Sequence, residues 1–157
     1  MKFILLNIGK TNEKNIIEGI AHYFSRIKHY YSFEIEDLSI TYKSKTDATL
    51  IKEQEGKSVL AKIQNNDFLI LLDEKGQEFT SRELAKKLEH IITSSGSKNI
   101  FFVTGGAYGF SQEVYQRANL KLSLSKLTFP HQLVRLIFCE QLYRAFTIIK
   151  GEKYHHD

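Results

Sequence analysis

The feature that most constrains the fold of this chain is an alternation between short apolar runs and longer amphipathic segments. Runs such as residues 3–8 and 68–72 have the length and composition of strands that are buried on both faces of a parallel sheet. The segments between these runs place apolar side chains three or four residues apart, which is the period of a helix with one buried face. This alternation predicts an α/β fold with a mostly parallel sheet and flanking helices.

The predicted elements follow one another without an internal repeat, a low-complexity tract or a long linker, so residues 1–157 are predicted to form a single domain. Thr11 or Asn12 can cap the first helix, and residues 73–76 are expected to turn the chain after a strand. The predicted strands cover 3–8, 33–38, 68–72, 100–103 and 120–124, and the later helices cover 47–63, 80–92, 111–117 and 130–150.

The last predicted helix, residues 130–150, is apolar nearly all round. A helix of this kind is buried on all sides, whereas the sheet of so small a domain can cover only one side of it. We therefore expect a second copy of the chain to cover the other side, in a homodimer.

Composition limits the classes of function. Lys and Arg total 22 against 18 Asp and Glu, and the net charge of +4 permits an anionic partner without requiring one. The single cysteine, Cys139, excludes a disulfide framework and a multi-cysteine zinc site, and the histidines lack ligand-spaced partners, so no metal is expected. No apolar run is long enough to span a bilayer and no signal peptide is evident, so we expect a cytoplasmic protein without a membrane partner.

Residues 105–109, Gly-Gly-Ala-Tyr-Gly, follow a predicted strand and precede a helix that begins near Ser111. Glycines at such a place let the backbone turn sharply and let a ligand approach closely, and the free N–H groups of the next helix favour polar ligand atoms. The pattern is not the dinucleotide-binding G-x-G-x-x-G. A tight turn without a ligand explains the motif equally well.

Residues 122–131 make a second candidate ligand loop, because a strand ends there and Pro130 starts a helix. Open α/β sheets bind ligands at the carboxyl ends of their strands. The hydroxyl groups in this segment could bind a small polar molecule, and its apolar side chains could enclose the flat part of that molecule. The alternative is a helix start at which the hydroxyls only satisfy backbone N–H groups.

The chain ends in Gly-Glu-Lys-Tyr-His-His-Asp, and a tail of this kind is often only frayed and solvated. His155 could act as a base if another surface held it in place. Arg135 could reach a phosphate, although a solvated or paired arginine is the commoner case. Glu140 and Arg144 have the i,i+4 spacing of a simple ion pair.

Four segments together resemble one known family. They are Leu-Ser-Leu-Ser-Lys-Leu-Thr-Phe-Pro-His-Gln-Leu-Val-Arg at 122–135, Glu-Gln-Leu-Tyr-Arg-Ala-Phe at 140–146, Gly-Glu-Lys-Tyr-His at 151–155 and the opening Lys-Phe-Ile-Leu-Leu-Asn-Ile-Gly-Lys. The family is the bacterial ribosomal RNA large subunit methyltransferase H family, also called the YbeA family, of small SPOUT-class enzymes. The resemblance covers essentially the whole chain.

The resemblance implies a SPOUT-type fold with a C-terminal trefoil knot, which periodicity alone cannot reveal. It also implies a homodimer that transfers a methyl group from S-adenosylmethionine (SAM) to N3 of a pseudouridine in 23S rRNA within the assembled ribosome. The family's SAM contacts fall here on Leu72, Gly105, Leu124, Ser125, Lys126, Leu127, Thr128 and Phe129.

Under this resemblance the tail supplies the proton chemistry. We expect His155 to be the base or proton relay, Tyr154 to position it, and Arg135 and Arg144 to contact a phosphate or an imide oxygen. Three residues depart from the family's pattern, with Leu at 127 for Met, Ala at 107 for Ser and Lys at 153 for Pro. A ribosome-associated RNA-binding module that retains the fold without catalysis is the alternative function.

Overall fold

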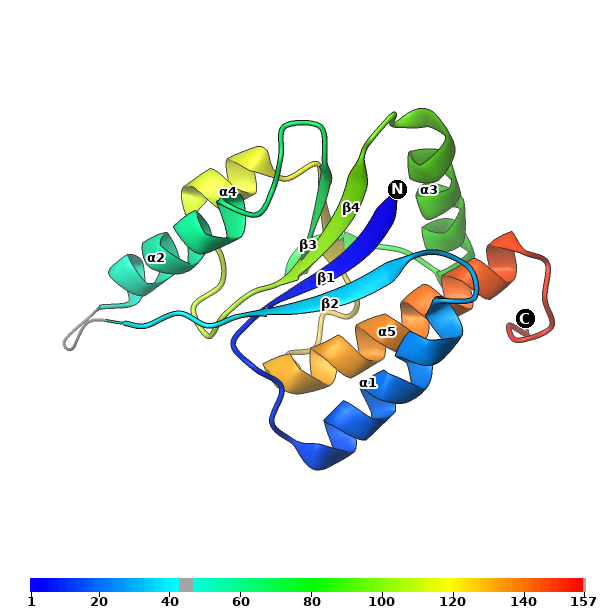
Figure 1. The fold of residues 1–157 in the computed structure, drawn as a ribbon, viewed down its shortest axis with the longest axis horizontal. Helices are drawn as coiled ribbons and strands as arrows, with labels where there is room; N and C mark the ends of the chain where they lie inside the picture. The colour runs from blue at the N-terminus through cyan, green and yellow to red at the C-terminus, as the bar shows by residue number, and fades with distance from the viewer. Residues whose placement is uncertain (43–46, 157) are drawn as a thin grey trace.

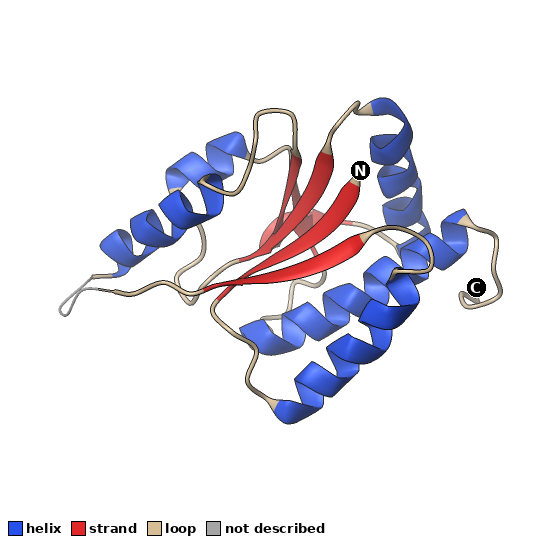
Figure 2. Ribbon diagram, viewed as in Figure 1, coloured by secondary structure: helices blue, strands red, loops and turns tan. Residues whose placement is uncertain are grey.

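Strands that are apolar on both faces form a sheet that must be covered on both sides, and this is the architecture observed (Figures 1 and 2). The computed structural model describes residues 1–42 and 47–156. Its sheet has the order β2-β1-β4-β3-β5, and every pairing is parallel. The strands are β1 (Lys2–Ile8), β2 (Phe33–Leu38), β3 (Phe68–Glu78), β4 (Asn99–Thr104) and β5 (Leu120–Ser123). The prediction of an α/β fold with a parallel sheet is confirmed.

Two groups of helices cover the two faces of the sheet, as Figure 1 shows. On one face, α1 (Lys14–Ile27), α3 (Ser81–Ser94) and α5 (His131–Ile149) pack against a core that includes Phe3 and Phe102. On the other face, α2 (Ala48–Leu60) and α4 (Gln112–Arg117) pack against Leu6 and Val103. Because successive strand residues point to opposite faces, a continuous apolar run supplies both cores.

The start of α1 differs from the prediction. The N-cap residue is Glu13, and neither Thr11 nor Asn12 caps the helix. The side chain of Gln132 at the start of α5 accepts hydrogen bonds from the backbone N–H groups of Asn12 and Glu13, both at 3.0 Å. Gln132 thereby holds the two residues with which the chain enters the helix, while no side chain caps the first turn.

The prediction of a turn at 73–76 is also wrong, because β3 continues to Glu78. After Leu72 pairs with Leu122, the register shifts, and Gln77 and Glu78 pair with Leu122 and Ser123 of β5. A β-bulge of this kind absorbs extra residues without ending the strand. The polar residues 73–75 thereby lie at the end of the sheet at which β5 also terminates.

α5 packs against α1, α3 and the sheet, and much of its surface is buried within a single chain. Leu133 and Leu136 of α5 are partly buried and pack against this core, and Ile17 of α1 is 46% exposed. The second copy that the sequence led us to expect stays a prediction, as does the trefoil knot.

Candidate functional site

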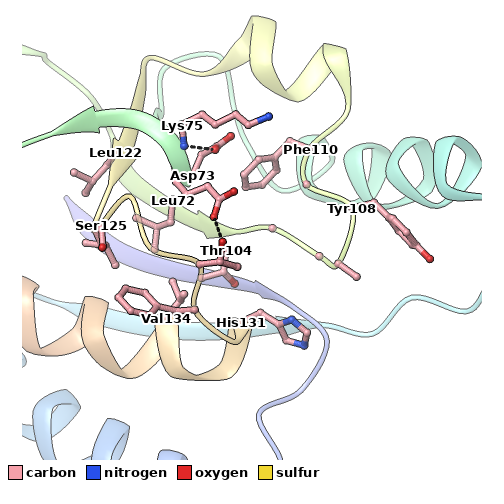
Figure 3. Close-up of a pocket in the computed structure, with 18 of the residues that line it drawn as sticks. Leu72, Asp73, Lys75, Thr104, Tyr108, Phe110, Leu122, Ser125, His131 and Val134 are labelled. Carbon is pink, nitrogen blue, oxygen red and sulfur yellow. Dashed lines mark hydrogen bonds between the residues drawn. The ribbon is translucent and has the colours of Figure 1, made fainter.

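β4 and β5 end on either side of Leu72 of β3, and a cavity of about 580 Å³ opens at this level of the sheet (Figure 3). This volume lies within the range of small-molecule sites. Leu72 marks the common level of the three strands, because it pairs with Thr104 on one side and with Leu122 on the other. Loops that are distant in the sequence converge there because parallel strands end at the same edge.

The cavity gathers most of the residues that the sequence identified as ligand contacts. Seven of the eight line it, and these are Leu72, Gly105, Leu124, Ser125, Leu127, Thr128 and Phe129. Lys126 is not among the lining residues; its side chain is 83% exposed and its ammonium group lies 3.4 Å from the Glu78 carboxylate. The glycine loop and the 122–131 loop, which were separate candidates in the sequence, thus form one site.

Sequence reasoning missed the acidic wall of the cavity, Asp73 and Glu74. Tyr115 Oη donates a hydrogen bond to Asp73 Oδ2 at 2.5 Å, and burial together with this carboxylate raises the pKa of Tyr115 to about 12. Thr128 Oγ1 donates to Glu74 Oε2 at 2.9 Å and so ties the 122–131 loop to the end of β3. The sequence signal for this acidic wall was the position of Asp73 directly after the apolar run 68–72. It was overlooked because residues 73–76 were expected only to turn the chain.

The electrostatics of the wall favour a cationic ligand. Asp73 and Glu74 contribute two carboxylates, while Lys75 is the one Lys or Arg among the described residues that line the cavity. The hydrogen-bond donors to Asp73 and Glu74 include a phenol, a hydroxyl and the Lys75 backbone N–H, none of which carries a positive charge. An excess of negative charge in a concave site attracts positive ligands.

The geometry of the glycine loop explains its composition. Gly109 has φ +77°, a conformation that L side chains rarely adopt, and its N–H donates to the carbonyl oxygen of Gly106 at 3.2 Å. A Cβ atom on Gly105 would lie 3.2 Å from the ring of Phe110, which is tight. The loop is therefore a compact turn whose backbone forms the cavity wall directly.

The two serine hydroxyls of the other loop form hydrogen bonds with its backbone. Ser125 Oγ accepts a hydrogen bond from the N–H of Leu127 at 3.0 Å, and Ser123 Oγ donates to the carbonyl oxygen of Ser125, also at 3.0 Å. These bonds fix the loop before Pro130, the N-cap residue of α5. Leu127 is 71% exposed although it lines the cavity, so an apolar side chain stands at the entrance.

The tail packs on the middle of α5 through a cluster centred on Glu140. Glu140 Oε1 accepts from Arg144 Nε at 3.0 Å and from Tyr154 Oη at 3.1 Å, and the guanidinium of Arg144 lies 4.7 Å from the ring centre of Tyr154. Arg144 Nη1 lies 3.4 Å from His155 Nδ1. The hydrogen bond to Glu140 raises the pKa of Arg144, and burial is the main factor that raises the pKa of Tyr154.

The structure does not bring the tail and the cavity together within one chain. The cavity meets α5 only at His131 and Val134, near the start of the helix, and none of the described tail residues, 150–156, lines it. The tail instead follows the opposite end of α5, as Figure 1 shows. Arg144, Tyr154 and His155 therefore form one group, separate from the seven residues of the cavity.

Arg135 requires a correction. Its side chain is 1% exposed, and its guanidinium donates hydrogen bonds to the Ile8 carbonyl oxygen and the Thr11 hydroxyl, both at 2.8 Å. Burial lowers the pKa of this guanidinium, while the charge of Asp37 acts in the opposite direction. The expected contact with a phosphate or an imide oxygen is excluded by this burial, and Arg135 instead ties α5 to the end of β1.

Two further features concern metal sites and membrane-spanning helices. Across 1–42 and 47–156, no cluster of three or more His, Cys, Asp or Glu side chains has the arrangement of a metal site. In the same part of the chain, no helix combines the length and apolarity needed to cross a membrane.

Comparison with known proteins gives consistent matches over the full chain. Residues 1–155 match the family model described as "Predicted SPOUT methyltransferase". Proteins named ribosomal RNA large subunit methyltransferase H are 49% identical in Cytophaga hutchinsonii, covering 99% of this chain and 100% of that protein, and 48% identical in Christiangramia forsetii, covering 99% of both. A third, from Parabacteroides distasonis, is 46% identical and covers 100% of both chains.

Among solved structures, a Legionella pneumophila protein in complex with bound SAM is matched with a TM-score of 0.45 and 12% identity, over 90% of this chain and 65% of that chain. A similarity this low supports no conclusion about the ligand of the present chain. The family match and the full-length relatives suffice for the assignment of family. This chain belongs to the SPOUT methyltransferase family.

Proposed function

We propose that this protein transfers a methyl group from SAM to N3 of a pseudouridine in 23S rRNA. In this proposal it acts on the assembled ribosome in the cytoplasm, as a homodimer. The observation that carries the proposal is the cavity at the ends of β3, β4 and β5, which is lined by seven of the eight residues expected to contact SAM. The names of the relatives, which are 46–49% identical over the whole chain, support ribosomal RNA as the substrate.

The cavity suits the donor in size and charge. Its backbone wall at residues 105–109 and its apolar side chains Leu72, Leu124 and Phe129 would hold the flat adenine and its ribose. Asp73 and Glu74 provide the negative charge that a sulfonium ion favours. When bound, SAM supplies a methyl group that is already activated, so a metal is not required for the transfer.

The tail is proposed to handle the proton. His155 accepts the N3 proton of the pseudouridine, and the N3 electron pair forms the bond to the methyl carbon while the carbon–sulfur pair leaves with sulfur. In this proposal Tyr154 holds the position of His155 through the cluster at Glu140, and Arg144 would contact an imide oxygen or a phosphate. Lys126 lies between the lining residues Ser125 and Leu127, and its exposed side chain, now beside Glu78, would turn toward the donor.

The separation of tail and cavity supports a site shared between two chains. Since no residue of the described tail lines the cavity of its own chain, the tail of one protomer would complete the cavity of its partner. Ile17 of α1, which is 46% exposed, and the partly buried Leu133 of α5 would offer apolar side chains for that contact. A symmetric pair of such contacts gives a closed dimer with two sites.

The first test separates SAM binding from methyl transfer with His155→Ala, using His156→Ala as the matched control. We expect SAM affinity by titration calorimetry to be unchanged in both variants. Transfer of labelled methyl groups to ribosomes lacking this modification should fall roughly 10²- to 10⁴-fold in His155→Ala only, the usual contribution of a general base. Turnover at the wild-type rate in His155→Ala would remove this residue from the mechanism.

The second test asks whether the tail acts on the partner's cavity. Gly105→Val should abolish SAM binding, because its side chain would crowd Phe110 and the cavity, while sedimentation shows the dimer intact. Equal amounts of Gly105→Val and His155→Ala chains, unfolded and refolded together, should recover about a quarter of wild-type activity, since half of the dimers have one complete shared site. No recovery would show that each tail serves its own chain.

The same assays address the alternative of a non-catalytic RNA-binding module. Ribosome binding without SAM binding, and without methyl incorporation, would support that alternative over the enzyme.

A further inference from the structure

A buried carboxylate lies directly behind the glycine loop, on the side away from the cavity. Glu55 belongs to α2 and is 4% exposed, within the packed face formed by α2, α4 and the sheet. Its Oε1 accepts a hydrogen bond from Tyr42 Oη at 2.6 Å. Its Oε2 is buried and has no hydrogen-bond partner among the described residues, 1–42 and 47–156.

The carboxylate touches the loop at Gly106. A Cβ atom at Gly106 would lie 2.5 Å from Oε2 and 2.7 Å from Oε1 of Glu55, so only glycine permits this approach. Gly106 also lines the cavity. The thickness of a single residue therefore separates the negative charge of Glu55 from the space in which a ligand would bind.

Packing alone does not account for a glutamate at this position. Burying a carboxylate with one of its oxygens unpaired costs free energy, and an apolar side chain of similar size would fill the same space without that cost. In low-dielectric surroundings, however, a charge acts strongly on other charges nearby. Groups that are unfavourable for stability and adjacent to a ligand site are candidates for a functional role.

We infer that Glu55 is a specificity-determining residue that favours the cationic methyl donor over the uncharged reaction product. This inference rests on the proposed function. SAM carries a positive sulfonium, whereas S-adenosylhomocysteine, the product left after transfer, has a neutral thioether at the same place. The charge of Glu55, added to those of Asp73 and Glu74, stabilises the donor selectively and so promotes exchange of product for fresh donor.

The test compares both ligands in Glu55→Gln, which removes the charge and keeps the shape and the acceptor for Tyr42. Titration calorimetry should show that the affinity for SAM falls about fivefold while the affinity for S-adenosylhomocysteine changes less than twofold. Sinefungin, which carries an amine near the position of the sulfonium, should follow SAM. Equal weakening of all three ligands, or no change in any of them, would overturn the inference.

A matched variant separates the charge of Glu55 from other charges on the same helix. Glu53→Gln removes an exposed charge from α2 and should leave the ratio of the two affinities unchanged. A loss of selectivity in Glu53→Gln as large as that in Glu55→Gln would contradict the assignment.

The failure of this inference is distinguishable from the failure of the proposed function. If the wild-type protein binds neither SAM nor its product, the cavity is not a donor site and the proposed function fails. If it binds both and Glu55→Gln leaves their ratio unchanged, only the role of Glu55 is refuted.

Discussion

The contact between Gly106 and Glu55 allows a sharp test of the packing behind the glycine loop. Gly106 is not among the glycines with positive φ, so replacing it by alanine introduces no backbone strain of that kind. The new methyl group would instead lie 2.5 Å and 2.7 Å from the two carboxylate oxygens of a side chain that is 4% exposed. Because that side chain has no open space to enter, either the loop or α2 must shift.

The expected magnitude follows from the behaviour of overpacked cores. Overpacking typically costs about 1–3 kcal/mol, so we expect Gly106→Ala to lower the free energy of unfolding by about 2 kcal/mol. For a domain of this size, this corresponds to a fall in Tm of roughly 4–8 °C. Glu55→Ala removes the obstructing carboxylate, so the double variant should be more stable than the sum of the two single effects by about 1–2 kcal/mol.

The measurement is urea unfolding followed by far-UV circular dichroism, on the wild type, the two single variants and the double variant. SAM affinity measured on the same four proteins reports whether the loop has moved into the cavity. Single effects that add within about 0.5 kcal/mol would show that the two residues do not interact and would refute the proposed contact.

Three further outcomes follow from contacts described above. Thr80→Ala removes the capping box at the start of α3, where the Thr80 hydroxyl accepts from the Glu83 N–H, and should cost about 1 kcal/mol in urea unfolding. Tyr115→Phe removes the donor to Asp73 and should also cost about 1 kcal/mol, and an unchanged stability would argue against that bond. Burial raises the pKa of the Cys139 thiol to about 12, so this thiol ionises at a lower pH in the unfolded chain than in the folded one. The free energy of unfolding should therefore fall as the pH rises from about 8.5, and Cys139→Ala should lack this contribution to the pH dependence.

The elements that neighbouring residues specify were predicted correctly from the sequence. The apolar run 68–72 and the sequence Thr-Ser-Arg-Glu at 80–83 each specify a structure through neighbouring residues, and both form as expected. The continuation of β3 to Glu78 depends on pairing with β5, over forty residues later, so residues 73–76 carry no local sign of it. The start of α1 at Glu13 likewise depends on Gln132.

In the candidate site, too, the features set by neighbouring residues were predictable and those set by distant residues were not. The loops at 105–109 and 122–131 were each predicted as ligand loops because each follows a strand, and the parallel sheet brings both to the same cavity. The burial of Arg135 was not predictable, because its partners Ile8 and Thr11 lie more than a hundred residues earlier. The approach of Glu55 to Gly106 was hidden for the same reason, since α2 reads in sequence as a weak helix without a pronounced apolar face.

The placement of the cavity on three neighbouring strands has a consequence for how the chain acquires its ligand. Leu72, Thr104 and Leu122 come together only when the order β4-β3-β5 is established, and these pairings link distant parts of the chain. Contacts of such long range form slowly, and no early fragment of the polypeptide contains the complete binding surface. Occupancy by the ligand therefore reports completed folding, and a saturating concentration of it protects the entire domain against unfolding by mass action.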